Sequence, residues 1–290
     1  MGSSSRPRRT VRAFMKFTDN LDNLDNDLPL LDHPLDAESE FTPQALIEAV
    51  RVRRNLVSVA VPEVCILEFD GDLTDHLVRN GAVSSWRSWA CFHTPMFALE
   101  VDGKPCGIVP RAIGAAYAVL VAEQLLVSGA RMIVGLTSAG RVSPSMRIPS
   151  VVVATAAIRD EGTSYHYLPP SRSVAAPPRP LTPLTSELRR LGLPVYEGTV
   201  WTTDAPYRET RLQLDRYAKQ GVLAVEMQAA SLFALAEVRK SQIAVVAHVS
   251  NATDYQGEPF ERGPETLGVQ ILTAICRAGL KVAAAIQESK

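Results

Sequence analysis

The sequence has no excess of either charge, and this argues against one large class of functions. Thirty lysines and arginines stand against thirty-one aspartates and glutamates, so the formal net charge at pH 7 is -1. A protein that binds nucleic acid through a broad surface carries a clear excess of basic residues. We therefore expect no nucleic-acid partner for this chain.

Long apolar runs and paired cysteines are also lacking. The apolar run over residues 151–157 is far shorter than the roughly 20 residues that a membrane-spanning helix needs, so we expect no membrane partner. The four cysteines are scattered without a C-x-x-C pair, which argues against a zinc ribbon and a disulfide scaffold. This cysteine usage is typical of a reducing compartment, and we expect a cytoplasmic protein.

Familiar cofactor motifs are missing as well. Gly114 stands almost alone in its segment, so the G-x-G-x-x-G fingerprint of a dinucleotide site is absent. The five histidines show no H-x-H or H-E-x-x-H spacing, and no G-x-S-x-G elbow occurs. We therefore expect neither a metal nor an organic cofactor.

The N-terminal segment is unevenly charged. Residues 1–17 carry five basic side chains and no acidic one, whereas residues 18–40 carry eight acidic side chains and no lysine or arginine. Blocks of like charge with little apolar patterning usually stay solvated. We predict a charged, disordered tail over residues 1–40 and a folded domain over residues 41–290.

From residue 41 onward, apolar strands alternate with helical segments. Thr42 as N-cap and Pro43 in the first turn predict a helix through about residue 54. Further helices are expected over residues 114–127, 184–190, 208–219 and 264–287. Strands are expected over residues 65–69, 96–101, 106–109, 131–137, 151–158, 195–203 and 243–249, and over residues 222–227, from which a helix runs through residue 239. The proline-rich segment 169–183 is expected to be a surface loop. The alternation predicts one α/β domain around a mixed sheet.

One short motif points to a different chemistry. Asp70 and Asp72 directly follow the strand predicted over residues 65–69, in the run Asp-Gly-Asp-Leu-Thr. Two carboxylates at a strand end can share a magnesium ion, and the run resembles the opening motif of haloacid-dehalogenase-type phosphatases. The later lysine and acidic pair that such enzymes need have no convincing equivalent, so this interpretation is the minor alternative.

Polar residues gather behind four of the predicted strands. Glu226 and Gln228 flank Met227 where a buried strand turns into an apolar helix. A buried glutamate there must be hydrogen-bonded, either to a ligand or to nearby backbone amides. The other clusters lie at residues 159–167, 202–210 and 250–251. Polar clusters beyond several α/β strands are typical of a small-molecule cleft.

These segments resemble the nucleoside phosphorylase superfamily, which contains uridine phosphorylase, hexameric purine nucleoside phosphorylase and related nucleosidases. The resemblance runs from about Val61 to Lys281 and is carried by residues 101–105, 159–169, 202–210 and above all 225–230. It implies a single-domain three-layer α/β sandwich around a mixed, partly barrel-like sheet, assembled as a homodimer or homohexamer. It also implies cleavage of the N-glycosidic bond of a nucleoside with phosphate as co-substrate, most like uridine phosphorylase.

The resemblance places the ribose site at residues 226–228. Met227 is implied to pack on the sugar beside Glu226, and Gln228 to hold the 2'- and 3'-hydroxyls. The family has glutamate at position 228, and an amide lacks the negative charge that stabilises an oxocarbenium-like ribose. Asn251, where relatives place an aspartate or an arginine, is the second implied catalytic residue.

The base and phosphate sites follow from the same resemblance. The residues implied to stack on the base or bind its edge are Tyr207, Arg208, Glu209 and Asn251. Those implied to hold phosphate are Thr137 and Ser138, and we expect Arg111, with Arg141 as a further candidate, to supply a relocated cation in place of the family's arginines. Leu73 and Val134 stand where the family has arginines, so two alternatives stay open: a nucleosidase that uses water, and a nucleoside-binding protein with little turnover.

Overall fold

A computed structural model of the chain describes residues 28–32, 34–252 and 263–288. Most of the tail predicted over residues 1–40 lies outside these ranges, so its disorder stays a prediction. The tail residues that are described, 28–32 and 34–40, form turns without a helix or strand.

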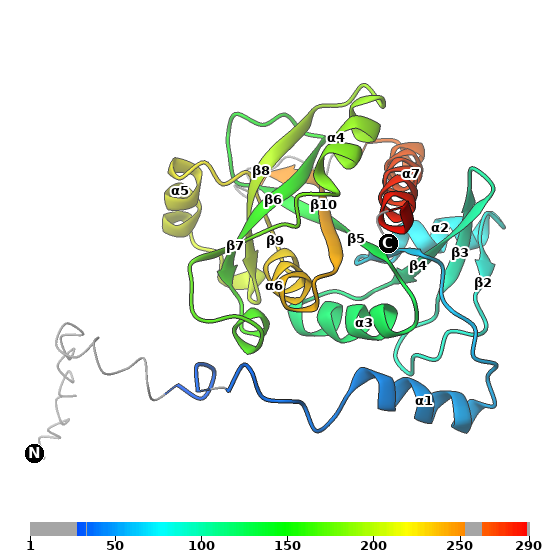
Figure 1. The fold of residues 1–290 in the computed structure, drawn as a ribbon. Helices are drawn as coiled ribbons and strands as arrows, with labels where there is room; N and C mark the ends of the chain where they lie inside the picture. Colours follow the sequence, from blue (N-terminus) through cyan, green and yellow to red (C-terminus); the bar gives the residue numbers. More distant parts are fainter. Residues whose placement is uncertain (1–27, 33, 253–262, 289–290) are drawn as a thin grey trace, which may run out of the picture.

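Within the described residues, ten strands form one sheet that partly closes on itself (Figure 1). Five strands close a barrel, because β9 pairs with β5 again. They are, in order, β5 (Met132–Arg141), β10 (Gln242–Ala252), β6 (Ser150–Asp160), β8 (Val195–Thr203) and β9 (Ala224–Glu226). The sheet continues outward from β5 through β1 (Val64–Glu68), β4 (Lys104–Pro110), β3 (Phe97–Val101) and β2 (Ser84–Ser85). The predicted mixed, partly barrel-like sheet is confirmed.

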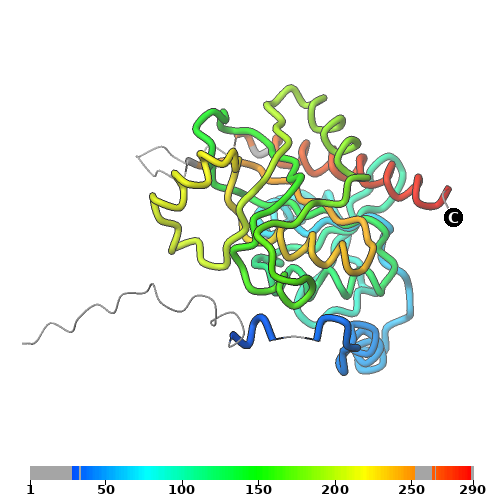
Figure 2. The backbone as a smooth tube through the Cα atoms, turned by 60° about the vertical axis from the view of Figure 1, so that its left-hand side comes forward, coloured from blue at the N-terminus to red at the C-terminus, as the bar shows by residue number. Residues whose placement is uncertain are grey.

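Helices cover both faces of the sheet (Figures 1 and 2). On one face α3 (Ala115–Val127) packs against α6 (Ala229–Arg239), and α1 (Pro43–Arg54) lies against α3. On the other face α4 (Leu181–Arg189) packs against α7 (Glu265–Glu288). Beside the barrel, α5 (Arg211–Lys219) places Tyr217 against Trp201 of β8. The three-layer α/β sandwich is thus confirmed.

The alternation of side chains along β5 explains the two buried faces. Ile133 belongs to the core beneath α3 and α6, whereas Met132 and Val134 belong to the core beneath α7. Neighbouring residues of a strand point to opposite faces of the sheet. The apolar pattern ends at Thr137 and Ser138, so β5 presents hydroxyl groups where it leaves the core.

Helix α7 is long and apolar enough, by length and composition alone, to cross a membrane over residues 266–288. Half of its most apolar stretch is buried in this structure, and the helix packs against β1, β5 and α4. Ile271, Leu272 and Ile275 are buried in the core beneath it. This is the packing of a core helix, and the absence of a membrane partner stays a prediction.

Two short elements differ from the sequence-based expectation. α2 (Asp72–Arg79) begins inside the Asp-Gly-Asp-Leu-Thr run, where no helix is predicted. β7 (Ser173–Ala175) lies inside the segment 169–183 that is expected to be a surface loop, and α4 begins at its end. The loop interpretation is wrong in these parts. Residues 173–175 satisfy their backbone groups by pairing with residues 156–158 of β6, which lie outside the segment and are not visible in its composition.

Candidate functional site

The ends of two groups of strands meet around Thr137 and Ser138. β1, β5 and β10 are parallel, so their carboxyl ends share one edge of the sheet. β9 runs antiparallel to β5, with Val225 opposite Gly140. This register carries the chain that leaves β9 past Ser138 and Thr137. Residues 226–228 are thereby brought to the carboxyl end of β5.

A buried network of hydrogen bonds holds residues 226–228 in this position. Glu226 accepts hydrogen bonds from the Thr202 hydroxyl at 2.5 Å and from the backbone amides of Gln228 at 2.6 Å and Ala229 at 2.8 Å. Gln228 is only 1% exposed, and its Oε1 lies 3.4 Å from the Thr137 hydroxyl oxygen. Of the two interpretations of Glu226, capping of nearby backbone amides is the one that this geometry shows.

Glu226 changes charge near neutral pH. Burial raises the pKa of Glu226 to about 7, although its three hydrogen-bond donors act in the opposite direction. Glu161, a second buried carboxyl, adds to the rise by charge repulsion. The protonation state of the segment that is implied to bind ribose therefore depends on pH.

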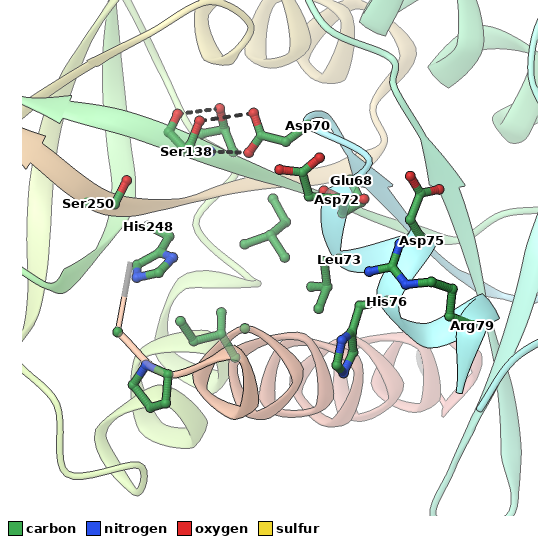
Figure 3. Close-up of a pocket in the computed structure, with 16 residues that line it drawn as sticks. Glu68, Asp70, Asp72, Leu73, Asp75, His76, Arg79, Ser138, His248 and Ser250 are labelled. Carbon is green, nitrogen blue, oxygen red and sulfur yellow. Dashed lines mark hydrogen bonds between the residues drawn. The ribbon is translucent and has the colours of Figure 1, made fainter. Parts of the chain in front are cut away.

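A pocket opens where β1, β5 and β10 end, on the side of the sheet that faces α7 (Figure 3). Its volume is about 420 Å³, which suits a small ligand. The pocket is rich in carboxyl and hydroxyl groups, supplied by Glu68, Asp70, Asp72, Asp75, Thr137, Ser138 and Ser250. Thr137 and Ser138 are the residues of the implied phosphate site that line it.

Asp70 is bound to β5 inside this pocket. Its Oδ2 accepts a hydrogen bond from the Ser138 backbone amide at 3.1 Å, and its Oδ1 accepts one from the Ser138 hydroxyl at 2.9 Å (Figure 3). Ser138 is implied to donate to phosphate. In this structure a carboxylate of the protein occupies both of its donors.

Glu68 fixes the start of α2 from beneath. Its buried carboxyl accepts hydrogen bonds from the Gly71 amide at 2.8 Å, the Thr74 amide at 3.2 Å and the Thr74 hydroxyl at 2.9 Å. Burial raises the pKa of Glu68, against these hydrogen bonds. Since Asp72 and Asp75 belong to the first turn of α2, Glu68 also sets where their carboxylates lie.

Arg111 lies apart from Thr137 and Ser138. Its guanidinium forms an ion pair with Asp75 of α2, which raises the pKa of Arg111, and the side chain crosses Gly71. A Cβ at Gly71 would stand 2.5 Å from Cγ of Arg111, and the φ of Gly71 is +89°. Arg111 is not among the described residues that line the pocket. Arg141 donates to the Met146 carbonyl instead.

The residues implied to bind the base are spread over two places. Tyr207 and Arg208 are exposed in the loop after β8, where Glu209 is half-buried and burial raises its pKa to about 7. Asn251 is paired in register with Gly140 of β5, so it lies at the barrel end near Ser138. The structure thus gathers the implied ribose residues and Asn251 at one end of the barrel, and leaves Tyr207 outside it.

Sequence reasoning left out part of the pocket. The polar lining residues that it did not select for this site are Glu68, Asp70, Asp72, Asp75, His76, Arg79 and His248, whereas Ser250 belongs to a cluster that it did select. Four of them lie on α2, at positions 72, 75, 76 and 79. Their spacing of three, four and seven residues is that of one helix face, so recognition of α2 would have revealed them. The described residues contain no group of three or more His, Cys, Asp or Glu side chains placed to hold a metal ion.

Comparison with known proteins identifies the family. A sequence model of the Phosphorylase superfamily matches residues 65–283. Similar curated proteins include a guanosine phosphorylase from Halorubrum lacusprofundi, 32% identical over 139 residues, which covers 47% of this chain and 56% of that protein. A uridine phosphorylase from Escherichia coli is 24% identical over 164 residues, 52% of this chain and 65% of that protein. A purine nucleoside phosphorylase from Plasmodium vivax is 26% identical over 135 residues, 46% of this chain and 55% of that protein.

The chain spans between about half and two thirds of the length of these relatives. The family match itself covers most of the chain, from β1 through residues 225–230 and into α7. It includes the Asp-Gly-Asp-Leu-Thr run at residues 70–74, so the interpretation of that run as a dehalogenase-type phosphatase motif is set aside. The chain belongs to the Phosphorylase superfamily.

Proposed function

We propose that this protein cleaves the N-glycosidic bond of a nucleoside. The contact between Gln228 and Thr137 carries this proposal, because it joins the residue implied to hold the ribose hydroxyls to one implied to hold the acceptor. Cleavage requires the anomeric carbon of the bound ribose to lie within bonding distance of the acceptor, so the ribose site and the acceptor site must adjoin. The fold brings them together from positions 91 residues apart.

The reaction expected from the sequence is phosphorolysis, which releases a free base and ribose 1-phosphate and makes the protein a pentosyltransferase. Relatives named uridine phosphorylase, guanosine phosphorylase and purine nucleoside phosphorylase support a nucleoside substrate, and they do not select one base. The sequence-based preference for uridine therefore forms part of the proposal.

A second candidate, hydrolysis of the same bond, is favoured by the charge of the pocket. Its lining holds four carboxyl groups, and Leu73 and Val134 replace the arginines that would offset the charge of phosphate. Bringing a phosphate anion beside these carboxylates is opposed by charge repulsion, whereas water meets no such barrier.

One assay separates the candidates. The purified full-length chain is incubated with uridine, guanosine, inosine and adenosine, each with and without inorganic phosphate, and base release is followed by chromatography. Release that requires phosphate supports phosphorolysis, and equal release in both conditions supports hydrolysis. Stabilisation against heat by a nucleoside, with no release, would instead mean a binding protein. The proposal is refuted if the chain neither binds nor cleaves any of these nucleosides.

The cytoplasmic location and the homodimeric or homohexameric assembly expected from the sequence are part of the same proposal. Light scattering coupled to size-exclusion chromatography distinguishes a 31.5 kDa monomer from either assembly. A monomer under assay conditions would contradict the assembly without affecting the proposed reaction.

A further inference from the structure

We infer that Asp70 excludes phosphate from this site and makes water the acceptor of the glycosyl group. The inference rests on the proposed function, since it concerns the acceptor in the same bond cleavage. It selects between the two candidate reactions and assigns a role to a residue that the family resemblance left without one.

Asp70 already fills an anion site. The backbone amide and the hydroxyl of Ser138 both donate to its carboxylate, at 3.1 and 2.9 Å. Two converging donors on one residue are the arrangement that holds an oxyanion. A carboxylate fixed on the same chain competes at a high effective concentration, so free phosphate must displace it before it can bind.

The charge around Asp70 also opposes the binding of phosphate. Glu68 and Asp72 line the same pocket, and Asp72 is the first residue of α2, two positions after Asp70 (Figure 3). The guanidinium of Arg111 is paired with Asp75. A phosphate that displaced Asp70 would therefore lie beside Glu68 and Asp72. Arg79, a cation that lines the pocket, is at the other end of α2 from Asp72, and the Arg111 charge is already offset.

The Asp70 carboxylate can also bind a water molecule. Asp70 is exposed to the pocket, and the two Ser138 donors use only part of its capacity to accept hydrogen bonds. It can therefore accept one more, from a water molecule. Thr137 and Ser138 both line the pocket, and the Thr137 hydroxyl contacts Gln228. This water would therefore lie at the end of β5 that the implied ribose segment reaches.

In the proposed step, water is the nucleophile and Asp70 is the proton acceptor. The water oxygen forms a bond to the anomeric carbon, and one water proton passes to the Asp70 carboxylate. The C1'–N bond breaks, and its electron pair leaves with the base, which takes a proton from solvent. Asp70 then returns its proton to solvent. The products are the free base and ribose.

The test compares the wild type with three variants, Asp70→Asn, Asp70→Ser and Asp215→Asn. Wild type is expected to release base at a rate that phosphate does not change. Asp70→Asn removes the proton acceptor, so kcat/KM without phosphate should fall by at least about 100-fold, whereas nucleoside affinity changes little. Asp215→Asn makes the same change at an exposed residue of α5 that does not line the pocket, and it should stay within about threefold of wild type.

Asp70→Ser should increase the affinity for phosphate, a result that damage to the fold would not produce. It frees the two donors of Ser138, so inorganic phosphate should bind at least about tenfold more tightly than to wild type, as measured by titration calorimetry. Unchanged phosphate affinity in Asp70→Ser would overturn the inference, as would undiminished hydrolysis by Asp70→Asn.

The outcomes also separate this inference from the proposed function. Wild-type cleavage that depends on phosphate overturns the role of Asp70 and leaves nucleoside cleavage standing. Binding of a nucleoside without cleavage overturns the role of Asp70 as well. Failure to bind or cleave any nucleoside refutes both.

Discussion

Glu226 of β9 and Thr202 of β8 are neighbours in register, and their side chains meet at 2.5 Å. The Thr202 oxygen also accepts a hydrogen bond from the Ala230 amide at 3.0 Å, while the Glu226 carboxyl accepts from the amides of Gln228 and Ala229. One buried pair thus ties two strands of the barrel to the start of α6. The position of the implied ribose segment depends on this pair.

The raised pKa of Glu226 predicts how stability varies with pH. Since its folded pKa is about 7, above the ordinary value of 4.5, its contribution is fully present at acidic pH and is lost as pH rises through 7. Glu226→Gln abolishes this titration. The difference in free energy of unfolding between wild type and Glu226→Gln should therefore shrink between about pH 5 and pH 8, by up to about 3 kcal/mol.

Urea denaturation at several pH values measures this difference. Glu237→Gln is the control, because it makes the same change at an exposed residue of α6, the helix that follows β9. A constant difference for Glu226→Gln across this range would show that Glu226 keeps one protonation state.

A second prediction concerns charge beside the ribose. Gln228 is neutral, so Gln228→Glu restores a negative charge next to the cation that forms as the glycosidic bond breaks. We expect kcat/KM for the cleaved nucleoside to rise by on the order of ten-fold. A carboxylate at position 228 keeps a donor, since the Met227 amide already donates to Oε1 of this residue.

Steady-state kinetics with the best nucleoside of the panel provides the measurement. Gln220→Glu makes the same change on the exposed end of α5 and should leave the kinetics unaltered. Equal or lower activity of Gln228→Glu would mean that the missing charge does not limit the reaction.

The buried arginine of β6 gives a prediction about the loop that follows it. Arg159 donates to the Ser164 hydroxyl, the Ser171 hydroxyl and the carbonyls of Leu168 and Pro169, and its guanidinium stacks on Tyr165. Lysine has a single charged nitrogen and cannot reach these acceptors together. We expect Arg159→Lys to lower the free energy of unfolding by about 2–4 kcal/mol.

Thermal and urea denaturation of Arg159→Lys test this expectation. Arg172→Lys is a suitable control, because Arg172 is exposed and donates to Gln220, so its replacement should cost less than about 0.5 kcal/mol. Equal stabilities of the two variants would contradict the role given to Arg159.

Where local signals are strong, the sequence alone predicts the structure well. Thr42 caps α1 as expected, and β8 has the predicted bounds. Between the strands predicted over residues 96–101 and 106–109, Asp102 and Gly103 form the turn that joins β3 to β4, both with positive φ, as a tight hairpin turn requires. In each case the determining residues lie within the element itself.

The candidate site could be predicted only in part, because its remaining contacts join distant residues. α2 begins at Gly71 without a side-chain cap, and the group that satisfies its first amides is Glu68 in β1. Asp70 reaches Ser138 across 68 positions, and Arg111 reaches Asp75 across 36. Hydrophobic patterning places the strands but carries no information about which polar groups pair across them.

Gly135 of β5 yields a last prediction, which links packing to the site. A Cβ at this position would stand 2.9 Å from Cε2 of Phe69 and 3.3 Å from Cγ2 of Val245, both in the buried core. Gly135→Ala should therefore destabilise the protein by about 1–3 kcal/mol through overpacking.

Phe69 immediately precedes Asp70, so a displaced ring also shifts the carboxylate that binds Ser138, and cleavage should slow together with the loss of stability. Gly162→Ala is the control, because Gly162 has a φ of -87° and its added Cβ would meet nothing nearer than 3.8 Å. That variant should stay within about 0.5 kcal/mol of wild type. If Gly135→Ala loses stability but keeps full activity, Asp70 is held by its bonds to Ser138 alone, independently of the core beneath it.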